Sequence, residues 1–389
     1  MIKRDAEEIL RKLAQGYYVI AVTGPRQAGK TTLVKHVFAR KRYISLEDPD
    51  EREFAGEDPK GFLARLPDGA ILDEVQRCPE LFSYLQSRVD NDRLPGQFIL
   101  TGSHQFGLLS GITQSLAGRV GLLELPPFTY TELKKARNSP ENLDKLLFKG
   151  LYPPIYDREL DPTNWYKNYM QTYVERDVRQ LINIKDLSTF QRFVRMCAAR
   201  IGQLLNLSSL ANECGITHNT AKSWISTLEA SYIVFLLQPH HRNYNKRMVK
   251  TPKLYFYDSG FAAWLLGIMN IEQLSIHALR GSLFEGWVIS ELVKNRFNRG
   301  RESNLYFWRD HTGNEIDVII EQGETLIPVE IKSGQTLSSA TFANLKKWLK
   351  LAGGDAEHAY LCYGGSDSYN RSETTILAWN SLDQLLQQN

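Results

Sequence analysis

Several features that mark specialised classes of protein are missing from this chain of 389 residues. No apolar run approaches the roughly 20 residues that a membrane-spanning helix needs, and the N-terminus shows no apolar signal segment. The four cysteines have no C-x-x-C spacing, which argues against a zinc site and suits a reducing compartment. We therefore expect a soluble cytoplasmic protein that makes no membrane contact.

An excess of charge of one sign is also missing, because Lys and Arg number 47, Asp and Glu number 44, and the formal net charge is only +3. The chain has no basic tail, internal repeat or low-complexity tract. Any contact with nucleic acid must therefore come from a local cluster of basic side chains. The hydrophobic fraction of 42% allows a sizeable core, and the length predicts two or three domains.

The most informative stretch is a glycine-containing loop with the spacing G-x-x-x-x-G-K-[ST] between a strand-like run, Tyr17–Thr23, and a helical run, Thr31–Arg40. Its residues are Gly24, Pro25, Arg26, Gln27, Ala28, Gly29, Lys30, Thr31 and Thr32. Glycines let several N–H groups converge on one anion, and the helix N-terminus adds partial positive charge. We predict that the loop binds ATP with Mg²⁺, with Lys30 at the β- and γ-phosphates and Thr31 on the ion.

Two further strand ends complete the predicted nucleotide site. The strand over residues 69–74 ends in Asp73, predicted to hold Mg²⁺, and in Glu74, predicted to orient and polarise the attacking water. The strand over residues 96–103 ends in hydroxyl groups. Ser103 is predicted to sense the γ-phosphate, with Thr101 as the competing candidate.

Arg119 follows a glycine in the segment 115–120 and is the predicted arginine of the site. Such a side chain neutralises the charge that develops on the γ-phosphate during transfer. The alternative is an ordinary surface arginine that forms an ion pair.

Residues 204–255 have the pattern of a winged helix. A short helix over residues 207–215 closes at a glycine, a second helix covers 218–228, and strands follow at 232–237 and 253–257. Basic side chains of the second helix and of the turn between the strands would neutralise DNA phosphates, and a tyrosine would stack or donate a hydrogen bond. These predicted contacts are Lys222, Arg242, Tyr244, Lys246, Arg247 and Lys250. The alternative is a winged helix that contacts protein.

The third group of residues lies on a predicted hairpin of strands 315–322 and 325–332. If Gly323 begins a two-residue turn, Gln322 pairs with Thr325, and counting back places Asp317 opposite Glu330 on one face. Lys332 shares that face because side chains alternate along a strand. Two acids on one face repel each other unless a cation lies between them. The alternative is a surface ladder in which Lys332 pairs with Glu315.

Taken together, these motifs resemble the AAA-type ATPases that carry a C-terminal domain catalogued as DUF4143, over residues 1 to 389. The resemblance is carried by Gly24–Thr32, Ile71–Gln76, Leu100–Ser103, Leu116–Val120, Lys246–Lys253, Tyr257–Gly260 and Gly281–Glu285. It implies an ATPase core, a winged helix and a restriction-endonuclease-like C-terminal domain. The likeness to ring-forming ATPases implies a homo-oligomer in which Arg119 completes a neighbour's site.

The resemblance to restriction-endonuclease-like nucleases, with their D…E-x-K pattern, assigns roles in the last domain. It implies that Asp317 and Glu330 hold Mg²⁺, that Lys332 positions or activates water, and that Glu285 adds a third metal ligand from the preceding helix. A fold of this kind can also persist after its chemistry is lost.

We therefore predict an α/β chain in four parts. These are a P-loop AAA-type ATPase core (1–130), a helical lid and connector (131–200), a winged helix-turn-helix (201–257) and a restriction-endonuclease-like DUF4143 domain (258–389). The predicted function is an ATP-hydrolysing, DNA-associated ATPase with a metal-dependent nuclease-like domain. The alternative is a nucleotide-controlled switch that binds DNA or protein without cleaving it.

Overall fold

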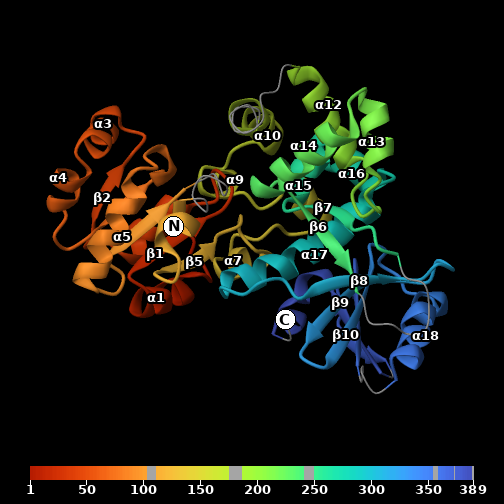
Figure 1. Ribbon diagram of the computed structural model, residues 1–389. Coiled ribbons are helices and arrows are strands. Elements are labelled where there is room, and N and C mark those ends of the chain that lie inside the picture. Colours follow the sequence, from red (N-terminus) through yellow and green to blue (C-terminus); the bar gives the residue numbers. More distant parts are fainter. Residues whose placement is uncertain (103–110, 175–185, 241–248, 354–357, 372, 388–389) are drawn as a thin grey trace.

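Two β-sheets organise the chain, one in its N-terminal part and one in its C-terminal part, with helices between them (Figure 1). The computed structural model describes residues 1–102, 111–174, 186–240, 249–353, 358–371 and 373–387. In Figure 1 the N-terminal sheet and its helices lie on the left, and the C-terminal sheet lies at the lower right.

The first sheet is parallel and has the strand order β2-β3-β4-β1-β5. Its strands are β1 (Val19–Thr23), β2 (Arg42–Ser45), β3 (Ala70–Asp73), β4 (Phe98–Thr101) and β5 (Val120–Glu124). The helices of this part are α1 (Glu7–Gly16), α2 (Lys30–Val37), α3 (Pro49–Glu57), α4 (Pro59–Ala64) and α5 (Leu81–Asp92). The predicted alternation of strands and helices is confirmed.

Strand β1 shows why these apolar runs become central strands. All five of its residues are buried, and successive side chains point to opposite faces. Val19 and Ala21 pack into one hydrophobic core, and Ile20 and Val22 into the other. Because both faces of the sheet are covered, a functional site is expected at the ends of the strands rather than on a face.

The middle of the chain is helical. Its helices are α7 (Tyr130–Lys135), α8 (Leu143–Lys149), α9 (Pro153–Asp157), α10 (Pro162–Tyr169), α12 (Leu187–Ala198), α13 (Leu207–Cys214), α14 (His218–Ala230), α15 (Ser259–Leu265) and α16 (Ile271–Ile276). The predicted helix pair at 207–215 and 218–228 is present as α13 and α14. The predicted strands follow as the antiparallel pair β6 (Val234–Pro239) and β7 (Lys253–Phe256).

The second sheet has eight strands in the order β12-β13-β11-β10-β9-β8-β6-β7. Its other elements are α17 (Arg280–Asn298), β8 (Leu305–Arg309), β9 (Glu315–Gln322), β10 (Thr325–Lys332), α18 (Ala343–Ala352), β11 (Ala359–Tyr363), β12 (Tyr369–Arg371), β13 (Thr374–Ala378) and α19 (Asp383–Leu386). The apolar runs of the sequence after residue 297 predict three strands, whereas the described residues form six, of which β12 is only three residues long and exposed.

The predicted hairpin β6–β7 is part of this second sheet. Gln238 and Pro239 of β6 pair in parallel with Tyr306 and Phe307 of β8. The helical middle and the C-terminal sheet therefore share one continuous hydrophobic core. Sequence periodicity carries no information about this pairing, because the two strands are far apart in the chain.

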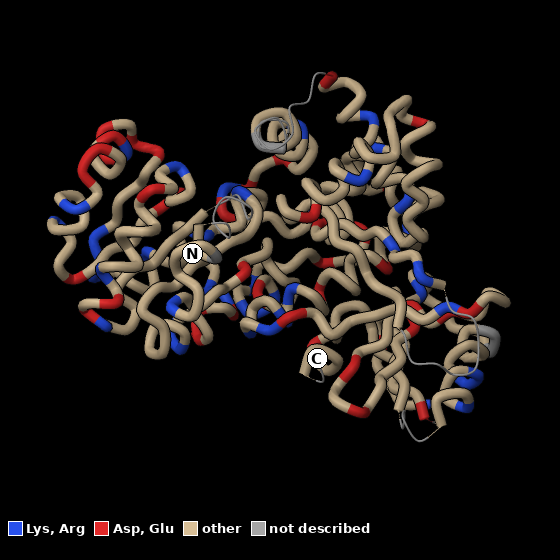
Figure 2. The backbone as a smooth tube through the Cα atoms, viewed as in Figure 1, with Lys and Arg blue, Asp and Glu red and all other residues tan. Residues whose placement is uncertain are grey.

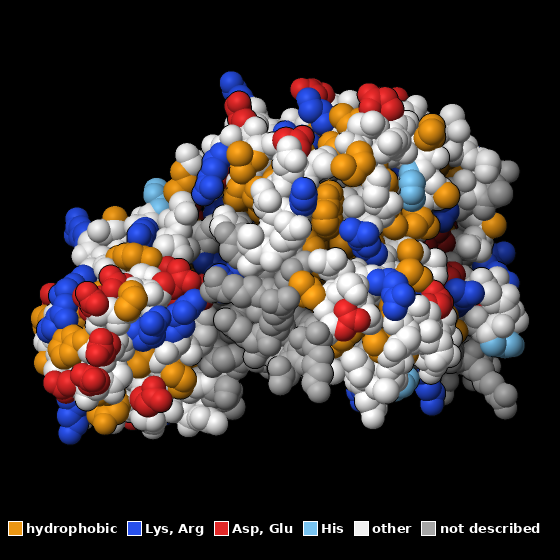
Figure 3. All heavy atoms as spheres, turned by 90° about the horizontal axis from the view of Figure 1, so that it is seen from above, with side chains coloured by type: hydrophobic (Ala, Val, Ile, Leu, Met, Phe, Trp, Pro, Cys, Tyr) orange, Lys and Arg blue, Asp and Glu red, His pale blue; other side chains and the backbone are white. Residues whose placement is uncertain are grey.

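The described surface is mixed in charge. Basic and acidic side chains are interspersed on the face seen in Figure 3. Among the helices within the described ranges, none has both the length and the apolar composition needed to cross a bilayer.

Candidate functional site

The predicted phosphate loop joins the carboxyl end of β1 to the first residue of α2. Gly24 and Gly29 have φ values of 141° and 90°, which residues with a side chain rarely adopt. A Cβ atom added at Gly24 would lie 2.1 Å from the carbonyl oxygen of Leu125. Glycine is therefore required there by conformation and by space.

Helix α2 begins without a capping side chain. Its N-cap is Gly29, whereas Asp48 caps α3 by accepting a hydrogen bond from the N–H of Asp50. The N-cap residue consequently offers no side-chain acceptor to the first-turn N–H groups of α2, and the helix dipole adds partial positive charge. This is the arrangement that favours an anion at a helix N-terminus.

Lys30 lies within the loop. Its side chain is 7% exposed, and its Nζ atom lies 2.9 Å from the carbonyl oxygens of both Gly24 and Pro25. Thr31, one residue later, faces the end of β3, and its hydroxyl lies 3.2 Å from Oδ2 of Asp73. The ammonium of Lys30, the hydroxyl of Thr31 and the carboxylate of Asp73 thus lie together at the carboxyl ends of the strands.

The carboxylate of Asp73 is held by hydroxyl groups from neighbouring elements. Tyr43 donates a hydrogen bond of 2.7 Å from β2, and Thr101 donates one from the end of β4. Burial and the Asp73 carboxylate raise the pKa of the Tyr43 phenol, so it remains a donor. Thr101 therefore orients Asp73, whereas Ser103, the other predicted residue of this strand end, lies outside the described residues.

Glu74 follows Asp73 in the left-handed region, with a φ of 54°. This conformation turns the chain sharply at the strand end, and Oε2 of Glu74 accepts a hydrogen bond of 2.6 Å from the side chain of Gln76. Glu74 lines the same cavity as Lys30, Thr31 and Asp73, which has a volume of about 290 Å³. The structure thus brings together four of the predicted nucleotide residues, namely Lys30, Thr31, Asp73 and Glu74.

Helix α9 covers one side of this cavity, and no sequence motif pointed to it. Its residue Asp157 and the following Arg158 line the cavity together with Arg26 of the loop. Arg158 is exposed, so its guanidinium adds positive charge to the lining of the cavity. The only local signal was the proline pair that opens α9.

Arg119 lies at the opposite edge of the first sheet from the loop. It precedes β5, whose first residue Val120 pairs with Val19 at the start of β1, whereas the loop follows the end of β1. Its guanidinium forms two hydrogen bonds, of 2.6 and 2.8 Å, with the carboxylate of Asp90. Arg119 therefore does not reach the loop of its own chain, and its action on a neighbour's nucleotide stays a prediction.

The predicted register of the C-terminal hairpin is confirmed at its turn, where Gln322 pairs with Thr325. The ladder of paired residues runs back to Val318 and Val329. Beyond that pair, Oδ2 of Asp317 accepts the hydrogen bond of 2.8 Å from the N–H of Ile331. Asp317 thus inserts its carboxylate where the backbone pairing of β9 and β10 ends.

Glu330 and Lys332 join Asp317 in one cluster. The Nζ atom of Lys332 lies 2.8 Å from Oε2 of Glu330 and 3.5 Å from Oδ2 of Asp317. Glu330 is 1% exposed, and its Oε1 has no hydrogen-bond partner among the described residues. Burial and the neighbouring Asp317 raise the pKa of Glu330. The alternative pairing is absent from the described ion pairs, because Glu315 bonds Lys253 and Arg309 instead.

Glu285 lies close enough to Asp317 that burial and this neighbouring carboxylate raise its pKa, and two other side chains hold it. Its Oε1 accepts a hydrogen bond of 2.5 Å from the hydroxyl of Tyr255 and lies 3.3 Å from Nζ of Lys253. Within the described ranges, no three His, Cys, Asp or Glu side chains converge as metal ligands. The role of Glu285 as a third metal ligand stays a prediction, and Lys253 and Tyr255 hold its carboxylate in the described contacts.

The predicted nucleic-acid contacts are only partly described. Lys222 is exposed on α14 and Lys250 is exposed just before β7, whereas Arg242, Tyr244, Lys246 and Arg247 lie outside the described residues. Helix α18 adds basic side chains that the sequence reasoning missed (Figure 2). Lys346, Lys347 and Lys350 are exposed on this helix, which packs against β9 and β10.

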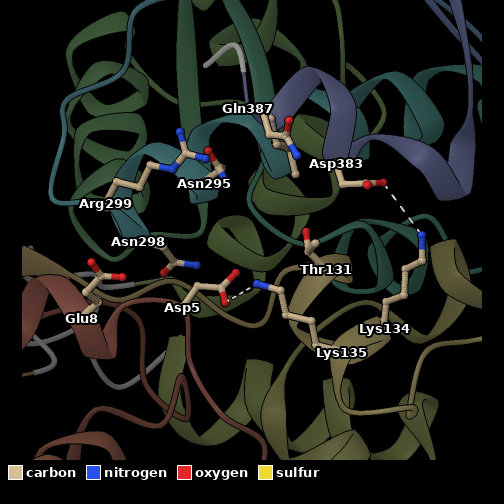
Figure 4. Close-up of a pocket in the computed structure, with 11 residues that line it drawn as sticks. Asp5, Glu8, Thr131, Lys134, Lys135, Asn295, Asn298, Arg299, Asp383 and Gln387 are labelled. Atoms are coloured by element: carbon tan, nitrogen blue, oxygen red, sulfur yellow. Dashed lines mark hydrogen bonds and ion pairs between the residues drawn. The ribbon is translucent and has the colours of Figure 1, made fainter.

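A larger polar cavity, of about 580 Å³, lies where α1, α7, α17 and α19 meet (Figure 4). Opposite charges in its lining face each other. Lys135 lies 2.6 Å from Asp5, and Lys134 lies 3.8 Å from Asp383. The cavity is distant in sequence from every predicted motif, and it marks the junction between the two halves of the chain.

Three stretches of the chain match described protein families. Residues 16–134 match an AAA domain, residues 140–272 match a domain of unknown function (DUF8612), and residues 280–382 match another (DUF4143). Two curated relatives are uncharacterized proteins of Mycobacterium bovis and Mycobacterium tuberculosis. Each is 31% identical to this chain, over 99% of this chain and 86% of the relative.

Solved structures with similarity to the chain include a Walker-type ATPase of Pyrococcus abyssi, with 15% identity, 68% of this chain and 96% of that chain covered, and a TM-score of 0.46. The RuvB Holliday junction branch migration motor of Thermotoga maritima has 18% identity, coverage of 59% and 88%, and a TM-score of 0.31. AMPPCP-bound DnaA from Aquifex aeolicus has 17% identity, coverage of 58% and 85%, and a TM-score of 0.30.

Proposed function

Because the chain belongs to the family of AAA-type ATPases that carry a C-terminal DUF4143 domain, we propose that it binds ATP with Mg²⁺ in the loop 24–32 and hydrolyses it. One observation carries the proposal. The cation of Lys30, the hydroxyl of Thr31 and the carboxylate of Asp73 line one cavity at the carboxyl edge of a parallel sheet. That edge is where α/β sheets bind ligands.

Phosphate binding, metal binding and activation of water fall to different side chains of the site. The uncapped N–H groups of α2 and the ammonium of Lys30 bind the phosphate oxygens. Thr31 and Asp73 are hard oxygen ligands that suit Mg²⁺, which when bound neutralises charge on the β- and γ-phosphates. Tyr43 and Thr101 keep the Asp73 carboxylate oriented. Glu74, the residue that directly follows β3, orients and polarises the attacking water.

We expect Glu74→Gln to retain ATP binding and to lose turnover by roughly a hundredfold or more, because only the group that polarises water is removed. ATP binding and phosphate release should be measured on the same preparation. Glu80→Gln, the same change at an exposed acid of the same region, is the control and should keep wild-type turnover. If Glu74→Gln hydrolyses ATP at the wild-type rate, another group is the base.

Ring assembly through the ATPase core is proposed from the family resemblance, and Arg119 is the residue that would act across the subunit boundary. Its partly exposed position at the sheet edge away from its own loop is compatible with such a contact. We expect Lys30→Ala protein mixed with Arg119→Ala protein to regain part of the ATPase activity, because some mixed interfaces contain both intact groups. If no activity is regained at any mixing ratio, Arg119 does not act on a neighbour's nucleotide, and its role is the ion pair with Asp90.

A second candidate function, metal-dependent DNA cleavage, is favoured by the cluster of Asp317, Glu330 and Lys332. The Oε1 atom of buried Glu330 has no hydrogen-bond partner in the described part of the chain and suits a cation, and two adjacent carboxylates provide oxygen ligands for Mg²⁺. Lys332 contacts both acids and would position or activate water. The chemistry that a bound metal supplies is activation of water and stabilisation of charge on the phosphate.

DNA would approach this cluster through phosphate contacts. The exposed lysines of α18 lie on a helix that packs against the strands of the two acids, and the predicted basic turn follows β6. Binding through such contacts weakens steeply as salt rises. The alternative is a switch that binds DNA or protein without cleavage. Incubation with linear and circular DNA, with and without ATP and Mg²⁺ or Mn²⁺, separates the two.

A further inference from the structure

The phosphate loop is held at both ends by side chains that are distant in the sequence. At its start, the hydroxyl of Thr23, the last residue of β1, lies 2.9 Å from the hydroxyl of Tyr232. Near its end, the carbonyl oxygen of Ala28 accepts a hydrogen bond of 2.8 Å from Nη1 of Arg4. The glycine-containing segment 24–28 thus spans two fixed points.

Tyr232 forms the first of these anchors. It lies between α14 and β6 with a φ of 56°, is 3% exposed, and donates a hydrogen bond of 2.9 Å to Oε1 of Glu124. A phenol has one proton, so the hydroxyl of Thr23 must donate to the oxygen of Tyr232. One hydroxyl therefore joins the ends of two strands, β1 and β5.

Arg4 forms the second anchor. It is 4% exposed, and its guanidinium also donates to the carbonyl of Pro126 at 2.7 Å and to Oε1 of Glu132 at 3.0 Å. Its planar fork lets these bonds form simultaneously, which fixes the carbonyl of Ala28 relative to the segment after β5. These acceptors satisfy the hydrogen-bonding groups of the buried guanidinium, so the side chain is held in one conformation.

Both anchors lead to the part of the chain that holds the second sheet. Tyr232 directly precedes the strand pair β6–β7 of that sheet. Glu132, the partner of Arg4, also accepts hydrogen bonds from the N–H of Asp5 at 2.8 Å and from Asn298 of α17 at 3.5 Å. Figure 4 shows Asn298 beside Asp5 at this junction. Helix α17 in turn packs against β10 and β7.

We propose that Tyr232 and Arg4 are positioning residues that hold the phosphate loop in the shape that receives a nucleoside triphosphate. The loop's geometry then depends on how the strand pair β6–β7 and helix α17 pack, although neither side chain touches the nucleotide. This inference rests on nucleotide binding by the loop, but the anchoring itself is measurable without nucleotide.

The test replaces only the anchoring hydroxyl. Tyr232→Phe keeps the ring, which packs against Tyr257, and removes both hydrogen bonds. We expect hydrogen–deuterium exchange in residues 20–32 of the nucleotide-free protein to accelerate. We also expect the dissociation constant for ATP to rise about tenfold, as for the loss of a buried hydrogen bond, with turnover at saturating ATP changed less than the affinity.

Matched variants separate positioning from general destabilisation. Tyr363→Phe removes a phenol that donates to the carbonyl of Asp367 in the C-terminal sheet, and it should leave exchange and ATP affinity unchanged. Thr23→Val removes the same bond from the other side. Arg4→Lys keeps the charge but not the planar fork. Both should reproduce the effect of Tyr232→Phe, and either serves if the tyrosine variant does not fold.

The outcomes separate the anchoring of the loop from the proposed nucleotide function. Unchanged exchange of the loop in folded Tyr232→Phe and Thr23→Val proteins would overturn the anchoring, whatever the ATPase activity. Faster exchange in a protein whose wild type binds no ATP would keep the anchoring and reject the proposed nucleotide function.

Discussion

Lys30→Ala is expected to reduce ATP hydrolysis by roughly a thousandfold or more, because it removes the charge placed where the transferred phosphate becomes more negative. Nucleotide binding should weaken as well, by about 10- to 100-fold, which corresponds to the roughly 1.5–3 kcal/mol of a hydrogen bond to a charged group. Phosphate release and equilibrium binding of ATP measure the two effects. The fold should remain, since the ammonium bonds two carbonyls of its own loop and the substitution leaves the backbone of α2 unchanged.

Lys60→Ala is the matched control for this prediction. Lys60 is an exposed lysine on α4 of the same ATPase part, so the same substitution should leave hydrolysis and ATP affinity unchanged. Retention of near wild-type hydrolysis in the Lys30→Ala protein would place phosphoryl transfer at another site of the chain.

Asp317→Asn is expected to abolish metal-dependent DNA cleavage while ATP hydrolysis continues at the wild-type rate. Asparagine keeps an oxygen that accepts the hydrogen bond from Ile331, so the end of the β9–β10 pairing is preserved. It removes the negative charge that a divalent cation requires. Loss of one of two adjacent acids also relieves repulsion on Glu330, so the melting temperature should not fall.

The control for Asp317→Asn is Glu324→Gln, which neutralises an exposed acid in the turn of the same hairpin and should not affect cleavage. Cleavage at the wild-type rate by Asp317→Asn would exclude Asp317 as a metal ligand. If the wild-type protein itself cleaves no DNA with Mg²⁺ or Mn²⁺, the alternative switch without cleavage becomes the better account of this domain.

The parts of the two sites that could be predicted from sequence are those with a local pattern. The loop 24–32 is contiguous, and its strand and helix are its immediate neighbours, so spacing alone identified it. The hairpin of Asp317 and Glu330 has a short turn at Gly323, so counting residues gave a register that the structure has at Gln322 and Thr325.

The residues that sequence reasoning missed reach the site through tertiary packing. Tyr43 reaches Asp73 from another strand, Arg158 reaches the cavity from α9, and Arg4 and Tyr232 reach the loop from opposite directions along the chain. None of these positions has a spacing relation to the loop. Glu285 shows the converse case, because a residue assigned by resemblance is held by Lys253 and Tyr255, and its own motif does not predict these contacts.

The central claim is that this chain hydrolyses ATP at the loop 24–32 with Mg²⁺. Phosphate release by the purified protein tests it most directly, measured with ATP and Mg²⁺, with ATP and excess chelator, and with the Lys30→Ala protein in parallel. We expect steady release by the wild type with Mg²⁺ and none above background in the other two samples. Equal release by wild type and Lys30→Ala, or no release by a wild type that binds ATP, would contradict it.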